Sequence, residues 1–139
     1  MKVARSPWRV AVLMSTLMLF AGSVSVLAQF GVREYDEFHQ VLHPLEHEAL
    51  PAKDFRRIRL NSAELVKRGR AVVRIGVPKG TDEKYAEEFR RELQRFDKAL
   101  DKLAEHSQKG TDEQLEVSFS AVHDSFETLA GMLPRKSSN

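Results

Sequence analysis

The chain of 139 residues contains no Cys, which excludes disulfides, thiolate catalysis and thiolate metal ligands. Its 22 Lys and Arg nearly balance its 20 Asp and Glu. Such a balance lacks the surplus of cations that binding to nucleic acid phosphates requires, so nucleic acid is not an expected partner.

Residues 1–28 have the features of a cleavable export signal. A positive start without acidic residues precedes an apolar run over residues 10–20. The segment ends in Val26-Leu27-Ala28, which matches the small-x-small rule for signal peptidase, so we expect the mature chain to begin at Gln29. The positive residues are Lys2, Arg5 and Arg9.

Removal of this signal sets the size, charge and destination of the mature protein. Taking three basic residues from 22 leaves 19 against 20 acidic residues, a net charge of −1. We expect a bundle domain over residues 29–134, a disordered tail over residues 135–139, and a periplasmic or secreted location.

The alternative to a cleaved signal is an uncleaved membrane anchor, because residues 10–28 are just long enough to span a bilayer. The small-residue end favours cleavage, after which no stable membrane insertion is expected.

Two helices are expected in the first half of the mature chain. The first begins near Arg33 and contains Pro44. A proline removes one backbone hydrogen bond and clashes with the preceding turn, at a cost of about 3 kcal/mol. The helix therefore kinks at Pro44, or a new helix begins with Pro44 as its first residue. The second helix covers approximately Lys53 to Ile75 and ends before Gly76 and Pro78.

Two further helices follow the same phrase, Lys-Gly-Thr-Asp-Glu, at residues 79–83 and 109–113. In each phrase Thr suits an N-cap and the acidic pair suits the positive end of a helix dipole. Gln114 completes a capping box with Thr111. Apolar residues then recur at steps of three and four, which predicts one buried stripe on each helix. The stripes are Tyr85, Phe89, Leu93, Phe96, Leu100 and Leu103, then Leu115, Phe119, Val122, Phe126, Leu129 and Leu133.

Four amphipathic helices with short loops predict an all-α, antiparallel four-helix bundle whose first helix is kinked or broken at Pro44. Residues 33–50 carry five acidic residues, whereas residues 53–74 carry eight basic residues. Opposite charges would hold these two helices together along their edges. The other possibility is that the basic helix faces an anionic membrane or partner.

Three of the five His, namely His39, His43 and His47, lie at steps of four in the first helix. Adjacent members of such a row can bind one divalent ion, because neutral imidazole suits Zn²⁺, Cu²⁺ and Ni²⁺. Glu46 adds an oxygen ligand. On the wheel of a straight helix the row drifts away from the apolar stripe, so that His47 points close to the opposite side.

A break at Pro44 would change this register and turn His43 or His47 toward His123 of the last helix. If the first and last helices are neighbours, His123 completes a site with two ligands from the first. Otherwise His123, at the edge of its apolar stripe, is a half-buried residue with a backbone or acidic partner. The sequence therefore predicts His43 and His47 as the core of a metal site, with His39, His123 and Glu46 as further ligands.

Residues 43–47 also match H-x-x-E-H, a zinc-peptidase pattern in which two His bind zinc and Glu acts as a base. That chemistry requires a continuous helix, a third ligand and a substrate cleft, whereas here a proline lies inside the pattern and the domain is small. No nucleophile with a base, paired carboxylates or phosphate loop is evident. We therefore expect a protein that is not an enzyme.

The layout of an exported four-helix bundle of this size, with residues 119–129 in the last helix, resembles the cytochrome c-prime type of periplasmic protein. That family attaches haem through a Cys-x-x-Cys-His motif, so the lack of Cys excludes covalent haem here. The resemblance implies a haem-free relative that holds a metal ion through His. The alternative is a metal-free envelope module, with a stress or chaperone-like accessory role, that binds a protein partner. Either form is compatible with a homodimer.

Overall fold

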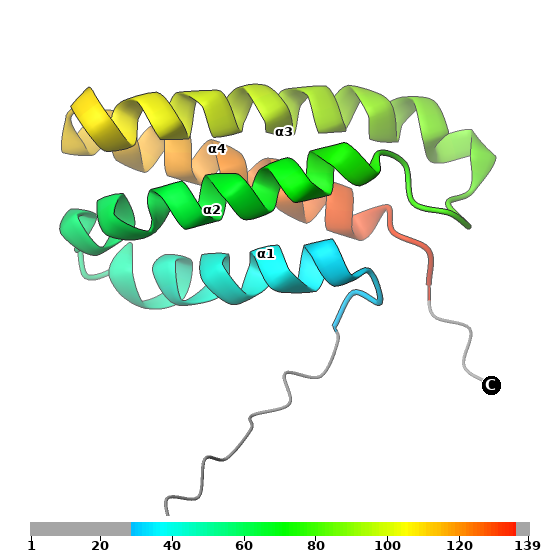
Figure 1. Ribbon diagram of the computed structural model, residues 1–139, viewed down its shortest axis with the longest axis horizontal. Coiled ribbons are helices and arrows are strands. Elements are labelled where there is room, and N and C mark those ends of the chain that lie inside the picture. The colour runs from blue at the N-terminus through cyan, green and yellow to red at the C-terminus, as the bar shows by residue number, and fades with distance from the viewer. Residues whose placement is uncertain (1–28, 136–139) are drawn as a thin grey trace, which may run out of the picture.

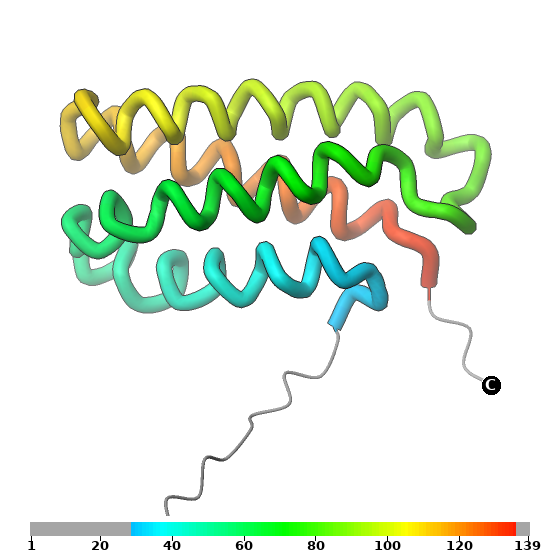
Figure 2. The backbone as a smooth tube through the Cα atoms, in the orientation of Figure 1, coloured from blue at the N-terminus to red at the C-terminus, as the bar shows by residue number. Residues whose placement is uncertain are grey.

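The computed structural model describes residues 29–135, so the predicted signal over residues 1–28 and the tail residues 136–139 lie outside the described residues. Four helices pack as an antiparallel all-α bundle (Figure 1), which confirms the predicted fold class. Both ends of the described chain lie at the same end of the bundle as the loop between α2 and α3 (Figure 2). The helices are α1 Arg33–Pro44, α2 Phe55–Ile75, α3 Glu83–Lys109 and α4 Asp112–Gly131. None of these helices is both long and apolar enough to cross a membrane.

The first helix changes its geometry at Pro44, as predicted. α1 ends there, and a π-helical turn, η1, continues the helix over Leu45–Ala49. The backbone N–H of Leu50 donates to the carbonyl of Leu45 at 2.8 Å, which closes the wider i to i+5 ring. Because proline has no N–H and crowds the preceding turn, the regular α-helical ladder stops at this point. Leu45 and Ala49 of η1 are both buried in the core.

Aromatic side chains fill the space between α1 and α4. The ring of Phe126 lies 4.7 Å from that of Phe38 and 5.7 Å from that of Tyr35, measured between centroids. The predicted apolar stripes are buried in this core except at their ends. Tyr85 is 41% exposed, because it lies in the first turn of α3, where Lys84 Nζ sits 4.8 Å from its ring centroid. Leu133 follows the end of α4 and is half-buried.

The two Lys-Gly-Thr-Asp-Glu phrases start their helices through different caps. At α4 the predicted capping box is confirmed, since Gln114 N donates to Thr111 Oγ1 at 3.2 Å and Thr111 N donates to Gln114 Oε1 at 2.9 Å. At α3 the N-cap is Asp82, so the prediction of Thr81 as N-cap is wrong. The hydroxyl of Thr81 instead donates to the carbonyl of Pro78 at 2.7 Å, because the first two residues of this phrase form a turn that brings Thr81 back to Pro78.

The basic residues of the second helical segment form ion pairs with all of its neighbours. Exposed pairs of this kind contribute about 0–1 kcal/mol each, so they fix how the helices face one another more than they stabilise the fold. Two of these pairs join α2 to α1 and η1, which confirms the expected attraction between the acidic and basic segments. The pairs are Arg68–Glu37, Arg57–Glu48, Arg70–Asp97, Arg70–Asp101, Arg59–Asp112 and Lys53–Glu116.

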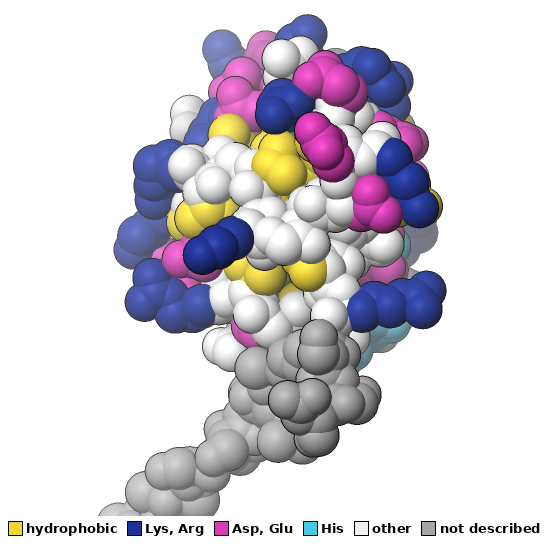
Figure 3. All heavy atoms as spheres, turned by 90° about the vertical axis from the view of Figure 1, so that its right-hand side faces the viewer, with side chains coloured by type: hydrophobic (Ala, Val, Ile, Leu, Met, Phe, Trp, Pro, Cys, Tyr) yellow, Lys and Arg dark blue, Asp and Glu magenta, His cyan; other side chains and the backbone are white. Residues whose placement is uncertain are grey.

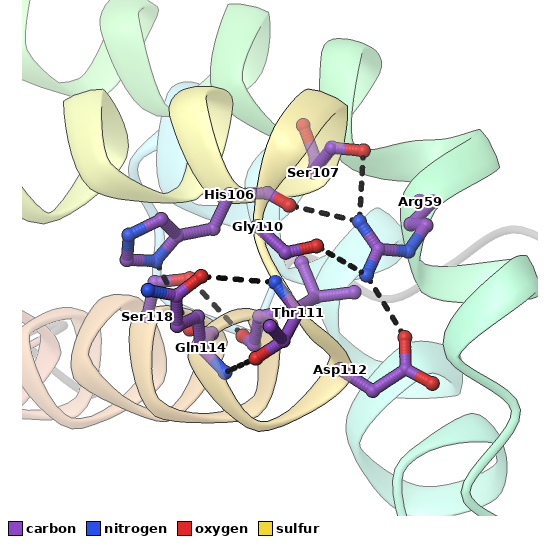
Figure 4. A network of polar contacts seen from close by, with 9 residues as sticks. Arg59, His106, Ser107, Gly110, Thr111, Asp112, Gln114 and Ser118 are labelled. Carbon is purple, nitrogen blue, oxygen red and sulfur yellow. Dashed lines mark hydrogen bonds and ion pairs between the residues drawn. The ribbon is translucent and has the colours of Figure 1, made fainter.

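Arg59 of α2 binds the connection between α3 and α4 (Figure 4). Its guanidinium donates to the carbonyls of His106, Ser107 and Gly110 at 2.8, 3.2 and 3.0 Å. It also donates to Asp112 Oδ1 at 2.8 Å. The last carbonyls of a helix have no partner within the helix, and a cation complements the negative end of the helix dipole. Arg59 therefore caps the carboxyl end of α3 from another helix.

The hydroxyl of Tyr35 is the one buried side-chain polar atom without a hydrogen-bond partner within residues 29–135. Burial raises the pKa of this phenol above its usual range. Since an unpaired buried hydroxyl costs about 1–3 kcal/mol, Tyr35→Phe is expected to keep or raise the free energy of unfolding. Urea denaturation of both proteins measures this change. A clear loss of stability in Tyr35→Phe would show that the hydroxyl has a partner.

Candidate metal centre

His39, His43 and His47 form a continuous row of imidazoles along α1 and η1. The ring centroids of His39 and His43 are 5.2 Å apart, and those of His43 and His47 are 4.4 Å apart. A π turn contains more residues than an α turn, so a step of four inside it advances less around the helix axis. The drift expected for a straight helix is therefore reduced, and His47 remains beside His43.

The inner end of the row lies against the aromatic core. The ring of His39 is half-buried and lies 5.3 Å from that of Phe30 and 6.2 Å from that of Phe126. Burial lowers the pKa of His39, and the charge of His43 acts in the same direction. The neutral imidazole that a metal ion requires is thus favoured at this position. His43 and His47 are exposed at the outer end of the row.

Glu46 joins this row to α4. Its Oε1 lies 2.8 Å from His123 Nε2, and its Oε2 lies 3.5 Å from His47 Nε2. His123 is 23% exposed and Glu46 is 25% exposed, so their contact is largely shielded from solvent. The first helical segment and α4 thus bring Glu46, His47 and His123 together, which meets the condition that the sequence analysis left open for His123.

Two acidic residues of α4 that the sequence analysis did not single out also lie at this cluster. Asp124 Oδ1 is 3.2 Å from His123 Nδ1, and Glu127 Oε1 is 4.0 Å from His123 Nε2. The signal for Glu127 was its position one helical turn after His123, on the same face. The fifth histidine, His106, lies elsewhere, with its Nδ1 3.0 Å from the carbonyl of Gln114 (Figure 4).

The distances between the side chains of this cluster can be compared with those that a bound metal ion requires of its ligands. Within the part of the chain that the structure describes, no three His, Asp or Glu side chains are arranged so that they could hold a metal ion as they stand. His47 Nε2 and Glu46 Oε2, 3.5 Å apart, nevertheless approach the separation of about 3.3 Å that Zn–ligand distances of about 2.0–2.1 Å imply at a tetrahedral centre. A site with three ligands would therefore require side chains of this cluster to move from the positions described here.

No protein-family model, no curated protein and no solved structure matches this chain. The all-α four-helix bundle is the part of the resemblance to the cytochrome c-prime type that the structure bears out.

Proposed function

We propose that this protein is an exported helical bundle that binds a divalent transition metal ion such as Zn²⁺, Cu²⁺ or Ni²⁺. The observation that best supports this proposal is the position of Glu46, whose two oxygens lie 2.8 Å from His123 and 3.5 Å from His47. The role would be binding, sensing or delivery of the ion in the periplasm or outside the cell, without catalysis. The core ligands are His43 and His47, with His39, His123 and Glu46 as further ligands.

The donor set determines which ions suit the site. Imidazole and carboxylate are ligands of Zn²⁺, Cu²⁺ and Ni²⁺, whereas Cu⁺ prefers thiolate and thioether sulfur. The chain has no Cys, and Met132 is its one Met after residue 28. An ion at Glu46 would link the first helical segment to α4, so its binding should also raise the free energy of unfolding. At a free-ion concentration of 100 times the Kd the gain is about 2.7 kcal/mol.

Calorimetric titration of the processed protein with Zn²⁺, Cu²⁺ and Ni²⁺ tests this proposal. We expect near-stoichiometric binding with micromolar or tighter affinity. The double variant His43→Ala/His47→Ala should bind more than about 100-fold more weakly, since loss of a residue that only supports a ligand already costs about 10- to 100-fold, and this variant lacks two ligands. His106→Ala is the matched control, because it removes an imidazole that lies outside the cluster. This variant should bind the ion as tightly as the wild type does.

The variants Glu46→Gln and His123→Ala locate the site more finely. If the ion bridges the two elements, each should weaken binding by at least about 10-fold and reduce the thermal stabilisation by the ion. Weak binding that is the same in the wild type and in every variant would remove the metal proposal.

A second candidate is a metal-free envelope module, with a stress or chaperone-like accessory role, that binds a protein partner through apolar surface. The observation that favours it is the exposure of two large apolar side chains, Leu60 at 72% and Val117 at 70%. Leu60 also lines a surface hollow together with Phe55 and Arg56. Isolated exposed apolar residues are common on protein surfaces, so this candidate ranks second. Ion binding that depends on His43 and His47 separates the two functions.

A further inference from the structure

The start of the described chain is bound to the first turn of α1. The backbone nitrogens of Gln29 and Phe30 both donate to Asp36 Oδ1, at 2.7 and 2.9 Å. The N-cap residue of this helix, Val32, offers no side-chain hydrogen bond. Asp36 therefore ties the segment before the helix to the helix itself.

The ring of Phe30 holds the same segment against the core. The half-buried ring of Phe30 lies 5.6 Å from that of Phe126 and 5.3 Å from that of His39. Gly31 then turns the chain with a φ of 74°, a value that glycine adopts without steric cost. With Phe30 packed against the core and Gly31 making the turn, the nitrogen of Gln29 is directed at the Asp36 carboxylate.

We propose that Asp36 is the binding site for the α-ammonium group that export processing creates on Gln29. Cleavage after Ala28, as the sequence predicts, converts the Gln29 nitrogen from an amide into a cation. The 2.7 Å contact then becomes a charge-assisted hydrogen bond, which is about twice as strong as its neutral counterpart. This inference rests on the predicted cleavage and is independent of the metal site.

The other charged groups near Gln29 make the role of Asp36 more specific. Arg135 lines the same surface hollow as Gln29, next to Leu133 and Pro134, and its charge opposes a second cation there. Figure 3 views this end of the bundle and shows apolar side chains surrounded by charged ones, with histidine at one edge. Asp36 supplies the negative charge that an ammonium group requires at this point.

Binding at Asp36 also affects a chemical reaction of an N-terminal glutamine. A neutral α-amine can attack the side-chain amide carbon of the same residue. A new C–N bond forms, the bond to the amide nitrogen breaks, and this nitrogen leaves as ammonia with a proton from the amine. The product is an uncharged pyroglutamate. An ammonium group has no lone pair for the attack, so Asp36 should slow this cyclisation.

To test this proposal, the full chain is expressed in a Gram-negative host that exports it, and the processed protein is isolated. Wild type is compared with Asp36→Asn, which keeps a hydrogen-bond acceptor but removes the charge. Glu34→Gln is the matched control, because it removes a carboxylate from the same helical turn that does not contact Gln29. Intact-mass spectrometry identifies the first residue and follows the cyclised fraction over time. Labelling of the α-amine at a series of pH values gives its pKa. Circular dichroism verifies that each variant is folded.

We expect a chain that begins at Gln29 and whose α-amine titrates above the usual range of about 7.7–8.0 in wild type and control. In Asp36→Asn the pKa should return to that range. A pKa difference of about half a unit changes the neutral fraction about threefold near neutral pH, so cyclisation should be about threefold faster in this variant. The proposal is overturned by a chain that begins elsewhere, by wild type isolated with its amine already cyclised, or by equal behaviour of wild type and Asp36→Asn.

Discussion

Replacement of Phe126 by Ala is expected to lower the free energy of unfolding by about 3–5 kcal/mol. The ring is fully buried and lies within 4.7–6.4 Å, between centroids, of Phe38 on α1 and Phe96 on α3. Its loss leaves a cavity that neighbours on two helices cannot fill, because their own rings are held in place by packing. Since small domains have a total stability of about 5–15 kcal/mol, the variant should be marginal or largely unfolded at moderate temperature.

Urea denaturation followed by far-ultraviolet circular dichroism measures this effect. Phe126→Leu retains most of the apolar volume and should lose clearly less stability than the Ala variant. Val117→Ala removes an exposed apolar side chain from the same helix and should change stability by no more than about 0.5 kcal/mol. A cost below about 1 kcal/mol for Phe126→Ala would mean that α1 and α4 do not pack through this ring.

Removal of the Arg59 guanidinium is expected to cost about 2 kcal/mol. A hydrogen bond to a charged group contributes about 1.5–3 kcal/mol, and Arg59 donates to three carbonyls and Asp112 Oδ1. The expected cost is well below the sum for four such hydrogen bonds, because the Arg59 side chain is 27% exposed. Water can therefore replace part of the lost hydrogen bonding. In Arg59→Ala the carboxyl end of α3 should fray and α2 should lose its anchor on the α3–α4 connection.

Hydrogen exchange gives the most specific measurement of this change. Amides near the end of α3 and the start of α4 should exchange faster in Arg59→Ala, beyond what the loss of global stability explains. Arg56→Ala is the control, since it removes an exposed cation from the same helix and should stay within about 0.5 kcal/mol of the wild type. Equal effects of the two substitutions would show that Arg59 acts only through the net charge of α2.

The fold could be predicted from the sequence because its signals are local. The apolar period of α3 and α4 and the cap at Thr111 each specify structure within a few residues, and the structure confirms them. Glu92 could not be predicted as a buried residue in this way. It is only 7% exposed and accepts a hydrogen bond of 2.5 Å from Ser125 of α4. A carboxylate is tolerated in a core only with partners. Arg95 of the same helix supplies one at 3.1 Å, but Ser125 comes from a distant part of the chain.

The candidate site could be predicted only in part for a similar reason. Spacing alone places His39, His43 and His47 in one row. The contact between Glu46 and His123 depends instead on the helix geometry after Pro44 and on the packing of the first helical segment against α4. Residue spacing alone predicts neither feature. A proline within a helical pattern permits a kink, a break or a wider turn, and tertiary contacts decide among them.

The π turn at Leu45–Ala49 has a consequence for sequence comparison. A turn closed by an i to i+5 hydrogen bond holds one residue more than an α turn. The insertion of a single codon into the gene for a regular helix would produce such a turn. An alignment of this chain with an uninterrupted helix must therefore place a one-residue gap inside this segment. Without that gap, positions after the turn are assigned to the wrong face, and residues that line the core are scored against residues that face solvent.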